Sequence, residues 1–115
     1  SLCSTTSTPS GRDCLLAGYP IRMSEVLAQT AGAVYVTREA ALDLAGIRKT
    51  KRAIKRAFLA QMHDLGFSSV EVLSTCPTNW GMTPSQSLDW IQDSMIPTYP
   101  LGDYKVAPEL AQKRK

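Results

Sequence analysis

The chain has 115 residues, of which 43% are hydrophobic and 20% are charged. These values are typical of one globular domain with a single core, and they exclude a chain that is disordered throughout. The formal net charge of +3 is too small to indicate nucleic acid as a partner by itself.

The N-terminal part of the sequence predicts an extended segment followed by a short helix. Residues 1–18 are rich in serine and threonine and contain proline and glycine, so we expect no regular element there. Ser24 is a candidate N-cap, because its hydroxyl can accept a backbone N–H that is unpaired at a helix start. The helix is predicted from Glu25 to about Ala31, and Gly32 ends it.

The middle of the sequence predicts a strand, a long helix and a second strand. Residues 33–37 are β-branched and aromatic and indicate a short buried strand, and residues 38–44 are expected to form a loop or a short helical turn. The long helix is predicted over residues 47–65, and alternating residues indicate a strand at 67–73. The apolar residues of the helix recur at three-, four- and seven-residue spacings and predict one buried stripe: Ile47, Ile54, Phe58, Met62 and Leu65.

The C-terminal part of the sequence predicts one more helix and an arm. Thr83 as the N-cap and Pro84 at the first helical position indicate a helix start. The helix should continue to about Met95 and end at Pro97. Three of its residues are predicted to point inward: Leu88, Ile91 and Met95. The tail after the helix is punctuated by prolines, and we expect an arm there.

The order of these elements predicts the α/β class. A strand–helix–strand unit of this spacing forms a right-handed crossover within a parallel sheet. Two strands are too few for a stable open sheet, so we expect a partial parallel sheet with flanking helices. Such a sheet would gain strands from a segment outside the chain, a partner chain or self-association. Three regions are predicted: residues 1–18 as an extended segment, 19–96 as the α/β domain and 97–115 as a C-terminal arm.

The segment after the second predicted strand, residues 74–81, has the composition of the rim of a site. It brings hydroxyl, thiol, amide and indole groups to the carboxyl end of a strand, where open α/β sheets bind ligands. Cys76 is either a reactive thiol or a small, half-buried thiol packed at a strand end. Thr78 and Asn79 either contact a ligand or complete a turn that Pro77 begins. No neighbouring base is evident, so no residue is assigned a catalytic role.

The long helix also carries six basic residues within nine positions. They form either a solvated face opposite the apolar stripe or a surface for phosphates or nucleic acid. Because no aromatic residues alternate with them to stack bases, we favour the solvated face and expect no nucleic-acid partner. The six are Arg48, Lys49, Lys51, Arg52, Lys55 and Arg56. His63, the single histidine, lies near the helix end, and no local motif indicates a catalytic role for it.

The sequence contains no self-contained catalytic or metal site. It has no glycine-rich phosphate loop, no paired-carboxylate motif and no cluster of metal ligands. Cys3, Cys14 and Cys76 are odd in number and include no Cys-x-x-Cys pair, which argues against a disulfide framework and against a zinc or iron–sulfur motif. A reducing, cytoplasmic compartment is therefore expected, and no apolar run predicts a membrane span.

Residues 70–81, Val-Glu-Val-Leu-Ser-Thr-Cys-Pro-Thr-Asn-Trp-Gly, resemble the beta subunit of 2-oxoacid:ferredoxin oxidoreductases. The similarity is to the 2-oxoglutarate-type and branched-chain 2-oxoacid branches in particular. Four further segments resemble the same subunit in the same order: Ser4–Asp13, Gly18–Pro20, Ala33–Arg38 and Ile47–Phe58. The resemblance therefore covers nearly the whole chain, and it implies part of a thiamine-diphosphate-binding fold.

The resemblance implies a role in an enzyme complex. In that family, thiamine diphosphate supports oxidative decarboxylation of a 2-oxoacid such as 2-oxoglutarate, electrons pass through an iron–sulfur cluster to ferredoxin, and the acyl group passes to coenzyme A. The diphosphate and Mg²⁺ are held by a Gly-Asp-Gly loop and an asparagine, both upstream of the matched region. The chain thus resembles only the C-terminal half of the subunit. It is expected to be inactive alone and to work with other subunits in an oligomer.

The resemblance also assigns positions to the candidate site. Cys76, Pro77 and Thr78 correspond to the family's Cys-Pro-Thr loop, and with Asn79 they are predicted to line the cofactor or substrate site without acting as catalytic residues. The chain begins at Ser1 without methionine, and we expect the cofactor loop in sequence upstream. The alternative is a non-enzymatic α/β interaction module that docks through its strand edge and basic helix. Nucleic-acid binding by the long helix is a weaker alternative.

Overall fold

The computed structural model describes residues 13–112, which divide into two compact units. The sheet unit contains residues 22–72 and 101–112, and the helical unit contains residues 13–21 and 73–100. Residues 1–12 and 113–115, with the sequence predictions made for them, lie outside the described part of the chain.

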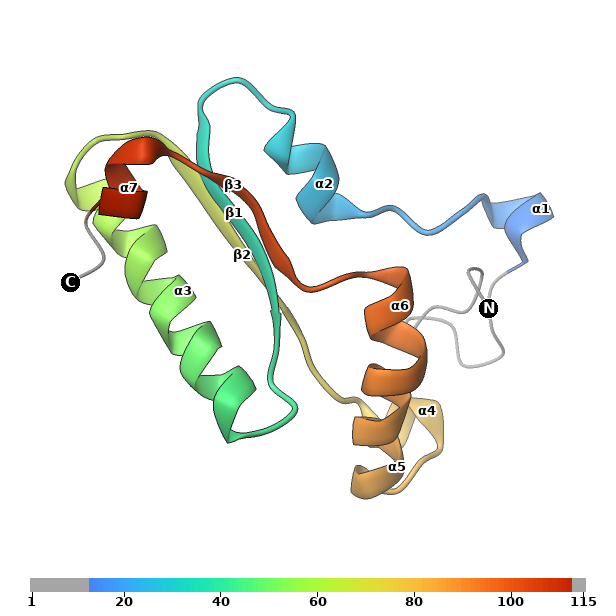
Figure 1. The fold of residues 1–115 in the computed structure, drawn as a ribbon. Coiled ribbons are helices and arrows are strands. Elements are labelled where there is room, and N and C mark those ends of the chain that lie inside the picture. Colours follow the sequence, from blue (N-terminus) through green and yellow to red (C-terminus); the bar gives the residue numbers. More distant parts are fainter. Residues whose placement is uncertain (1–12, 113–115) are drawn as a thin grey trace. The chain divides into compact units, whose positions relative to one another are not determined.

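The sheet unit is built on three strands in the order β2-β1-β3 (Figure 1). The strands are β1 (Ala33–Ala40), β2 (Phe67–Leu73) and β3 (Gly102–Val106). β1 and β2 run parallel, and β3 runs antiparallel to β1, with Tyr35 opposite Val106. The α/β class and the parallel pair are therefore confirmed, and the second strand has the predicted bounds.

The third strand corrects the prediction of an arm in the tail. Residues 102–106 pair with β1, and α7 (Pro108–Gln112) then places Leu110 in the core. The segment is short and half polar, so its own sequence gives little strand signal, and it is stabilised by pairing with β1. The chain itself thus supplies one of the strands that the sequence alone left missing.

The first strand is longer than predicted. β1 continues through Arg38, Glu39 and Ala40, which were expected in a loop or helical turn. Pairing with β3 extends to Arg38 opposite Gly102, and the Thr37 hydroxyl donates to the Gly102 carbonyl at 3.0 Å. A charged residue can occupy the middle of the sheet because carboxylates on other elements neutralise it.

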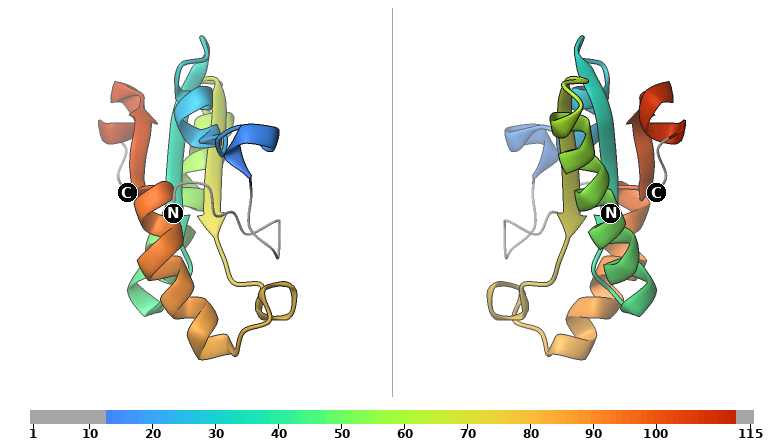
Figure 2. Two further views of the ribbon diagram at one scale, coloured as in Figure 1. Left: turned by 90° about the vertical axis from the view of Figure 1, so that its right-hand side faces the viewer. Right: turned by 90° about the vertical axis from the view of Figure 1, so that its left-hand side faces the viewer.

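Two helices cover opposite faces of this sheet (Figure 2). The long helix α3 (Leu44–Met62) connects β1 to β2 on one face, and α2 (Met23–Ala28) lies on the other. α3 begins three residues earlier than predicted, because the Asp43 carboxylate accepts the Gly46 N–H at 2.7 Å. Gly46 has no side chain to collide with the Ala40 carbonyl, which lets the first turn approach the end of β1.

The core between α3 and the sheet is made by small side chains on the helix. Ala53 and Ala60 are buried against Tyr35 of β1 and Leu110 of α7. Alanines let the helix axis approach the strands closely, and the larger side chains of the strands fill the remaining space.

The predicted apolar stripe of α3 does not form the core. Its first four members are exposed, with relative accessibilities of 40% at Ile47, 42% at Ile54, 66% at Phe58 and 76% at Met62. Only Leu65, beyond the end of the helix, packs on the core cluster. Periodicity identifies an apolar face but not the neighbour that covers it, and here the alanine face turns inward instead.

The prediction for α2 was wrong in its cap. The helix begins at Met23, its N-cap Arg22 makes no side-chain capping bond, and it ends at Ala28, short of Ala31. Ser24 lies inside the helix, is buried, and donates its hydroxyl proton to the Glu71 carboxylate at 2.5 Å. The hydroxyl therefore bonds to a side chain of β2 and not to the backbone of the helix N-terminus.

The helical unit contains five short helical segments. They are α1 (Cys14–Ala17), α4 (Pro77–Trp80), α5 (Pro84–Trp90), a π-helix η1 (Ile91–Met95) and α6 (Ile96–Thr98). No element was predicted before residue 19, but the Asp13 carboxylate accepts the Leu15 N–H at 2.9 Å and caps one helical turn.

The predicted start of α5 is confirmed. The Thr83 hydroxyl accepts the Gln86 N–H, the Gln86 side chain accepts the Thr83 N–H, and Pro84 is the first helical residue. This is a capping box, in which two otherwise unpaired donors are satisfied reciprocally. Of the residues predicted to point inward, Ile91 and Met95 are buried, whereas Leu88 is exposed. The helical path continues past Pro97, because the proline lies in the first turn of α6 where a missing N–H is tolerated.

A fully buried arginine ties the elements of the sheet unit together. The Arg38 guanidinium donates to both oxygens of Glu25 on α2 at 2.7 and 2.9 Å, and its Nε donates to Glu71 of β2 at 2.8 Å. It also donates to the Tyr104 hydroxyl of β3 at 3.1 Å. Arg38 is 0% exposed, and no buried side-chain nitrogen or oxygen in residues 13–112 lacks a hydrogen-bond partner.

The cluster shifts the pKa of Glu25. Burial alone would raise that pKa, but hydrogen bonds from Arg38 and Tyr104 outweigh burial and lower it from 4.5 to about 2. The carboxylate therefore stabilises the fold in its ionised form.

Replacing the buried arginine is expected to be costly. Arg38→Met leaves two carboxylates without their guanidinium, and we expect a loss of about 3 kcal/mol of unfolding free energy. Urea denaturation followed by circular dichroism measures this loss. Arg48→Met, at an exposed position of α3, is the matched control and should change stability by less than about 0.5 kcal/mol. Equal midpoints for the two variants would show that the cluster does not stabilise the fold.

Stability is also expected to depend on pH through Glu25. Because its folded pKa is below its unfolded value, its contribution is complete above about pH 4.5 and is lost as the pH falls toward 2. As the pH falls through this range, the unfolding free energy of Glu25→Gln should decrease by about 1 to 2 kcal/mol less than that of the wild type. Urea unfolding at pH 7, 4.5 and 3 measures the difference. Glu109→Gln on α7 should follow the wild-type profile, and parallel profiles for Glu25→Gln and wild type would contradict the assignment.

Candidate functional site

The four predicted site residues form the start of one helical turn directly after β2. Cys76 is the N-cap residue of α4 and makes no side-chain capping bond, and Pro77 is in the first turn. The Trp80 N–H donates to the Cys76 carbonyl at 3.0 Å, and the Met82 N–H donates to the Pro77 carbonyl at 2.9 Å. Gly81 ends the turn with a left-handed φ of 65°. The turn that Pro77 was expected to begin is therefore present.

The turn presents its polar groups outward. The Cys76 thiol is free and exposed, and Thr78 is exposed. The alternative of a half-buried thiol at the strand end is therefore wrong. Asn79 belongs to the same turn through its backbone. The structure keeps these candidates together because they are consecutive, and the segment from Ser74 to Met82 itself contains no charged residue.

This composition limits what the turn can do chemically. A thiol and a hydroxyl can bind or orient a ligand, but a nucleophilic cysteine needs a base or a depressed thiol pKa. The turn contains no histidine, carboxylate or lysine. His63 is exposed at the end of α3, in the other unit. The turn is therefore suited to lining a site rather than to catalysis by itself.

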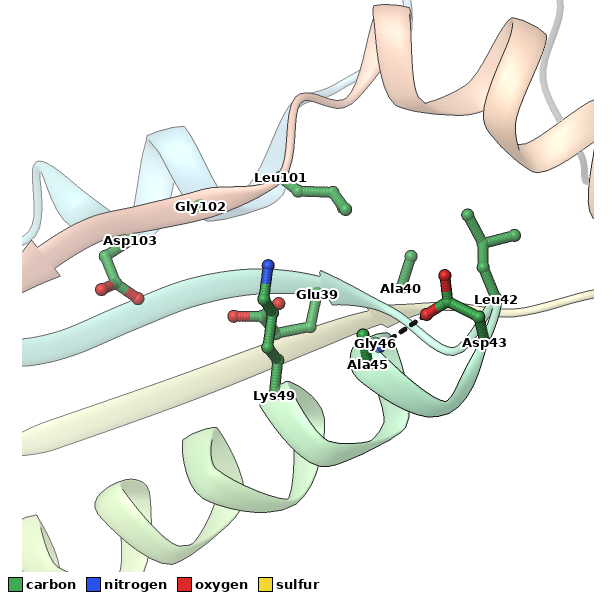
Figure 3. A pocket seen from close by; sticks show the side chains of 10 residues that line it. All are labelled: Glu39, Ala40, Leu42, Asp43, Ala45, Gly46, Lys49, Leu101, Gly102 and Asp103. Carbon is green, nitrogen blue, oxygen red and sulfur yellow. Dashed lines mark hydrogen bonds between the residues drawn. The ribbon is translucent and has the colours of Figure 1, made fainter.

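A cavity of about 470 Å³ lies elsewhere, in the sheet unit where β1 ends and α3 begins (Figure 3). Glu39 reaches it from β1, Asp43 and Lys49 from the start of α3, and Asp103 from β3. A neighbouring cavity of about 350 Å³ shares Glu39, Lys49 and Asp103 and adds two arginines and Tyr35. The two cavities follow the seam between α3 and β3.

The charges of this seam interact. Burial and the nearby Asp103 carboxylate raise the pKa of Glu39, while Lys49 and Arg52 act in the opposite sense. Burial raises the pKa of Tyr35 as well, and the Arg56 guanidinium lies 5.9 Å from the centre of that ring. The seam thus carries both carboxylates and cations, which suits a small polar group.

Sequence reasoning missed this cavity because two of its charged residues, Glu39 and Asp103, lie in strand segments that were not predicted. Glu39 was placed in a loop, and Asp103 was placed in the arm. The sequence signal for the third strand was weak: polar and aromatic or apolar residues alternate over only a few positions, Asp103 to Val106.

The described residues do not fit a thiamine-diphosphate site. That cofactor binds through a divalent cation, which takes oxygen ligands. No group of three or more histidine, cysteine, aspartate or glutamate side chains in residues 13–112 is placed to hold a metal ion. The turn at Cys76 carries no charge that could hold a diphosphate. No catalytic step through the cofactor is therefore assigned to these residues.

Three further sequence predictions concern the basic residues of α3, the cysteines and membrane spans. Five of the six basic residues of α3 are exposed, and Arg56 is half-buried over Tyr35, as a solvated face requires. Cys14 is disulfide-bonded, which the odd cysteine count did not predict. Among residues 13–112, no helix has both the length and the apolarity of a membrane span.

The chain is similar in sequence to a subunit of an oxidoreductase. It is 37% identical over 101 residues to ketoisovalerate oxidoreductase subunit VorA of Methanothermobacter marburgensis. It is 36% identical over 101 residues to the subunit of the same name from Methanothermobacter thermautotrophicus. No family model matches the chain, and no solved structure matches it.

These alignments differ in how much of each protein they cover. They include 88% of this chain but 21% of each relative, so the chain spans about a fifth of the length of the curated relatives it matches. Ketoisovalerate is a 2-oxoacid, so the relatives agree with the predicted enzyme class. Their name gives no support to the predicted 2-oxoglutarate type or to a beta subunit.

The exposure of the Cys76 thiol predicts that it reacts with an alkylating reagent in the folded chain. We expect iodoacetamide to alkylate Cys76 in the native, unreduced chain at a rate within about tenfold of glutathione. Peptide mass mapping over time measures this rate, and Cys76→Ser should remove the modified peptide. Cys14 is the internal control and should stay unmodified. Protection of Cys76 by more than about a hundredfold would contradict its exposed position.

Proposed function

We propose that this chain is part of a subunit of a 2-oxoacid oxidoreductase. The observation that carries the proposal is the match over 101 residues, at 37% identity, to a ketoisovalerate oxidoreductase subunit. The match includes 88% of the chain, so wherever it begins it involves β1, α3, β2 and the segment after β2 together.

We propose further that the substrate is a branched-chain 2-oxoacid and not 2-oxoglutarate. A pocket for 2-oxoglutarate needs a cation for the second carboxylate, because a buried charge without a partner is costly. The segment from Ser74 to Met82 contains no lysine, arginine or histidine. A substrate with an apolar side chain, such as ketoisovalerate, has no second carboxylate and places no such demand on the segment.

In this proposal Cys76, Pro77, Thr78 and Asn79 line one side of the substrate or cofactor site. The exposed Thr78 hydroxyl would hydrogen-bond to the ligand, and Cys76 would contact it without forming a covalent bond. The complete enzyme would use thiamine diphosphate with Mg²⁺, an iron–sulfur cluster, coenzyme A and ferredoxin. Thiamine diphosphate supplies the carbanion chemistry when bound. The residues that hold it would lie in other parts of the subunit or complex.

A non-enzymatic interaction module is the second candidate. The exposed apolar residues of α3 favour it, because such faces commonly bind other proteins. The two candidates differ in one property: only an oxidoreductase subunit makes turnover of a 2-oxoacid depend on this chain.

Reconstitution tests the proposed activity. This chain would replace the matched 101 residues of the M. marburgensis subunit, in complex with the partner subunits of that enzyme. We expect coenzyme-A-dependent reduction of a viologen dye, with kcat/KM at least tenfold higher for ketoisovalerate than for 2-oxoglutarate. Thr78→Val should raise KM about tenfold by removing one hydrogen bond, and Ser85→Ala in α5 should not.

The unmodified 115-residue chain is the negative control. It should show no turnover and no thiamine diphosphate binding by calorimetry below roughly 1 mM. An assembled complex that prefers 2-oxoglutarate would overturn the substrate proposal. A soluble, assembled complex without turnover of either substrate would overturn the proposed function.

A further inference from the structure

Both edges of the sheet lack a further strand in the described residues, and β2 is the longer of the two edge strands. β3 and β2 are the outer strands, and β1 is the single strand that pairs with β2. β2 is seven residues long, and its inward face toward α3 carries Ser68 and Val70. A long strand with a free edge is a template for another strand.

An apolar groove runs beside that edge. A cavity of about 260 Å³ lies between α3 and β2, and four of its six lining residues are apolar. The lining residues are Ile54, Ala57, Phe58, Gln61, Ser68 and Val70. Ile54 and Phe58 belong to the exposed stripe, which continues to Met62 at the end of the helix. The face therefore consists of the stripe, the groove and the β2 edge, all within the sheet unit.

Two exposed lysines of α3 lie on this face. At 100° per residue, Lys51 falls between Phe58 and Met62 within the stripe, and Lys55 lies just beyond Met62. A helix packed on the stripe would meet these two ammonium groups. The occupant should therefore be an amphipathic helix with acidic residues beside its apolar face.

The length of the relatives indicates where such an occupant comes from. The matched region is 21% of each relative, so most of each polypeptide lies outside it. The β1–α3–β2 unit is a parallel crossover, and one further unit of the same hand would place its strand beside β2 and its helix beside α3. That arrangement would cover the edge, the groove and the stripe at once.

We propose that this face docks a strand–helix unit from the remaining polypeptide of such a longer subunit, with the strand paired to β2 and the helix packed on Ile54, Phe58 and Met62. The identity of the occupant rests on the proposed function, whereas the exposed face is a property of this chain. A second copy of the chain is the competing occupant.

Binding to the rest of the relative tests the inference. The tagged portion of the M. marburgensis subunit outside the matched 101 residues would be co-expressed with this chain, and the mass of the product measured by size exclusion with light scattering. We expect a 1:1 complex and a monomeric chain when expressed alone. Phe58→Glu should weaken the complex at least tenfold, and Lys55→Glu should weaken it severalfold at low salt.

Val26→Glu is the matched control, because Val26 is an exposed apolar residue on α2, across the sheet from α3. It should leave binding unchanged. Circular dichroism and urea unfolding of each variant separate lost docking from lost folding. If the remaining portion is insoluble when expressed alone, co-expression still allows the test. Binding is then measured as the amount of untagged chain that is purified together with the tagged portion.

The outcomes separate the possibilities. A homodimer of the isolated chain that Phe58→Glu dissociates would assign the face to a second copy and overturn the inference. No complex with the remaining portion, or a complex insensitive to Phe58→Glu, would also overturn it. A 1:1 complex that depends on Phe58 but shows no 2-oxoacid turnover would support the docking and count only against the proposed function.

Discussion

The fold of the sheet unit depends on the burial of the Arg38 guanidinium at the centre of the sheet. A charge in that position is tolerated only where partners satisfy it, and Glu25, Glu71 and Tyr104 do so from three other elements. Because each partner must be at hydrogen-bond distance at the same time, the cluster specifies the register of β1, β2 and β3 and the position of α2. The face of the sheet under α2 is therefore held by polar groups. The face under α3 is apolar around Ala53 and Ala60 and charged near the start of that helix.

This difference between the two faces shapes the possible sites. On the α3 side, small alanines let the helix lie close to the strands, and two larger apolar residues, Ile54 and Phe58, line the groove beside β2. At the start of α3 the same close approach, with Gly46 beside the Ala40 carbonyl, leaves a charged cavity lined by Glu39 and Asp103. The uncharged turn at Cys76 has the opposite character. One short chain thus presents a charged cavity, an uncharged turn and an apolar face.

The candidate turn was predictable because its structure is local. Pro77 restricts the backbone and Gly81 accepts a left-handed conformation, and both effects act within five residues. The N-cap at Thr83 and the alternation of β2 are local in the same sense, and the start of α5 and the bounds of β2 were predicted correctly. The charged cavity was not predictable, because Glu39 and Asp103 meet only after β3 pairs with β1.

The sequence by itself determined the α/β class, the parallel β1–α3–β2 unit and the similarity to 2-oxoacid oxidoreductase subunits, since each depends on residue order and short spacings. Only the tertiary structure decided which face of α3 is buried, that the tail completes the sheet as β3, and that Arg38 lies inside it. These features arise from contacts between residues far apart in the chain. The stabilisation that these contacts provide depends on two elements at once, so the sequence of either element alone does not predict them.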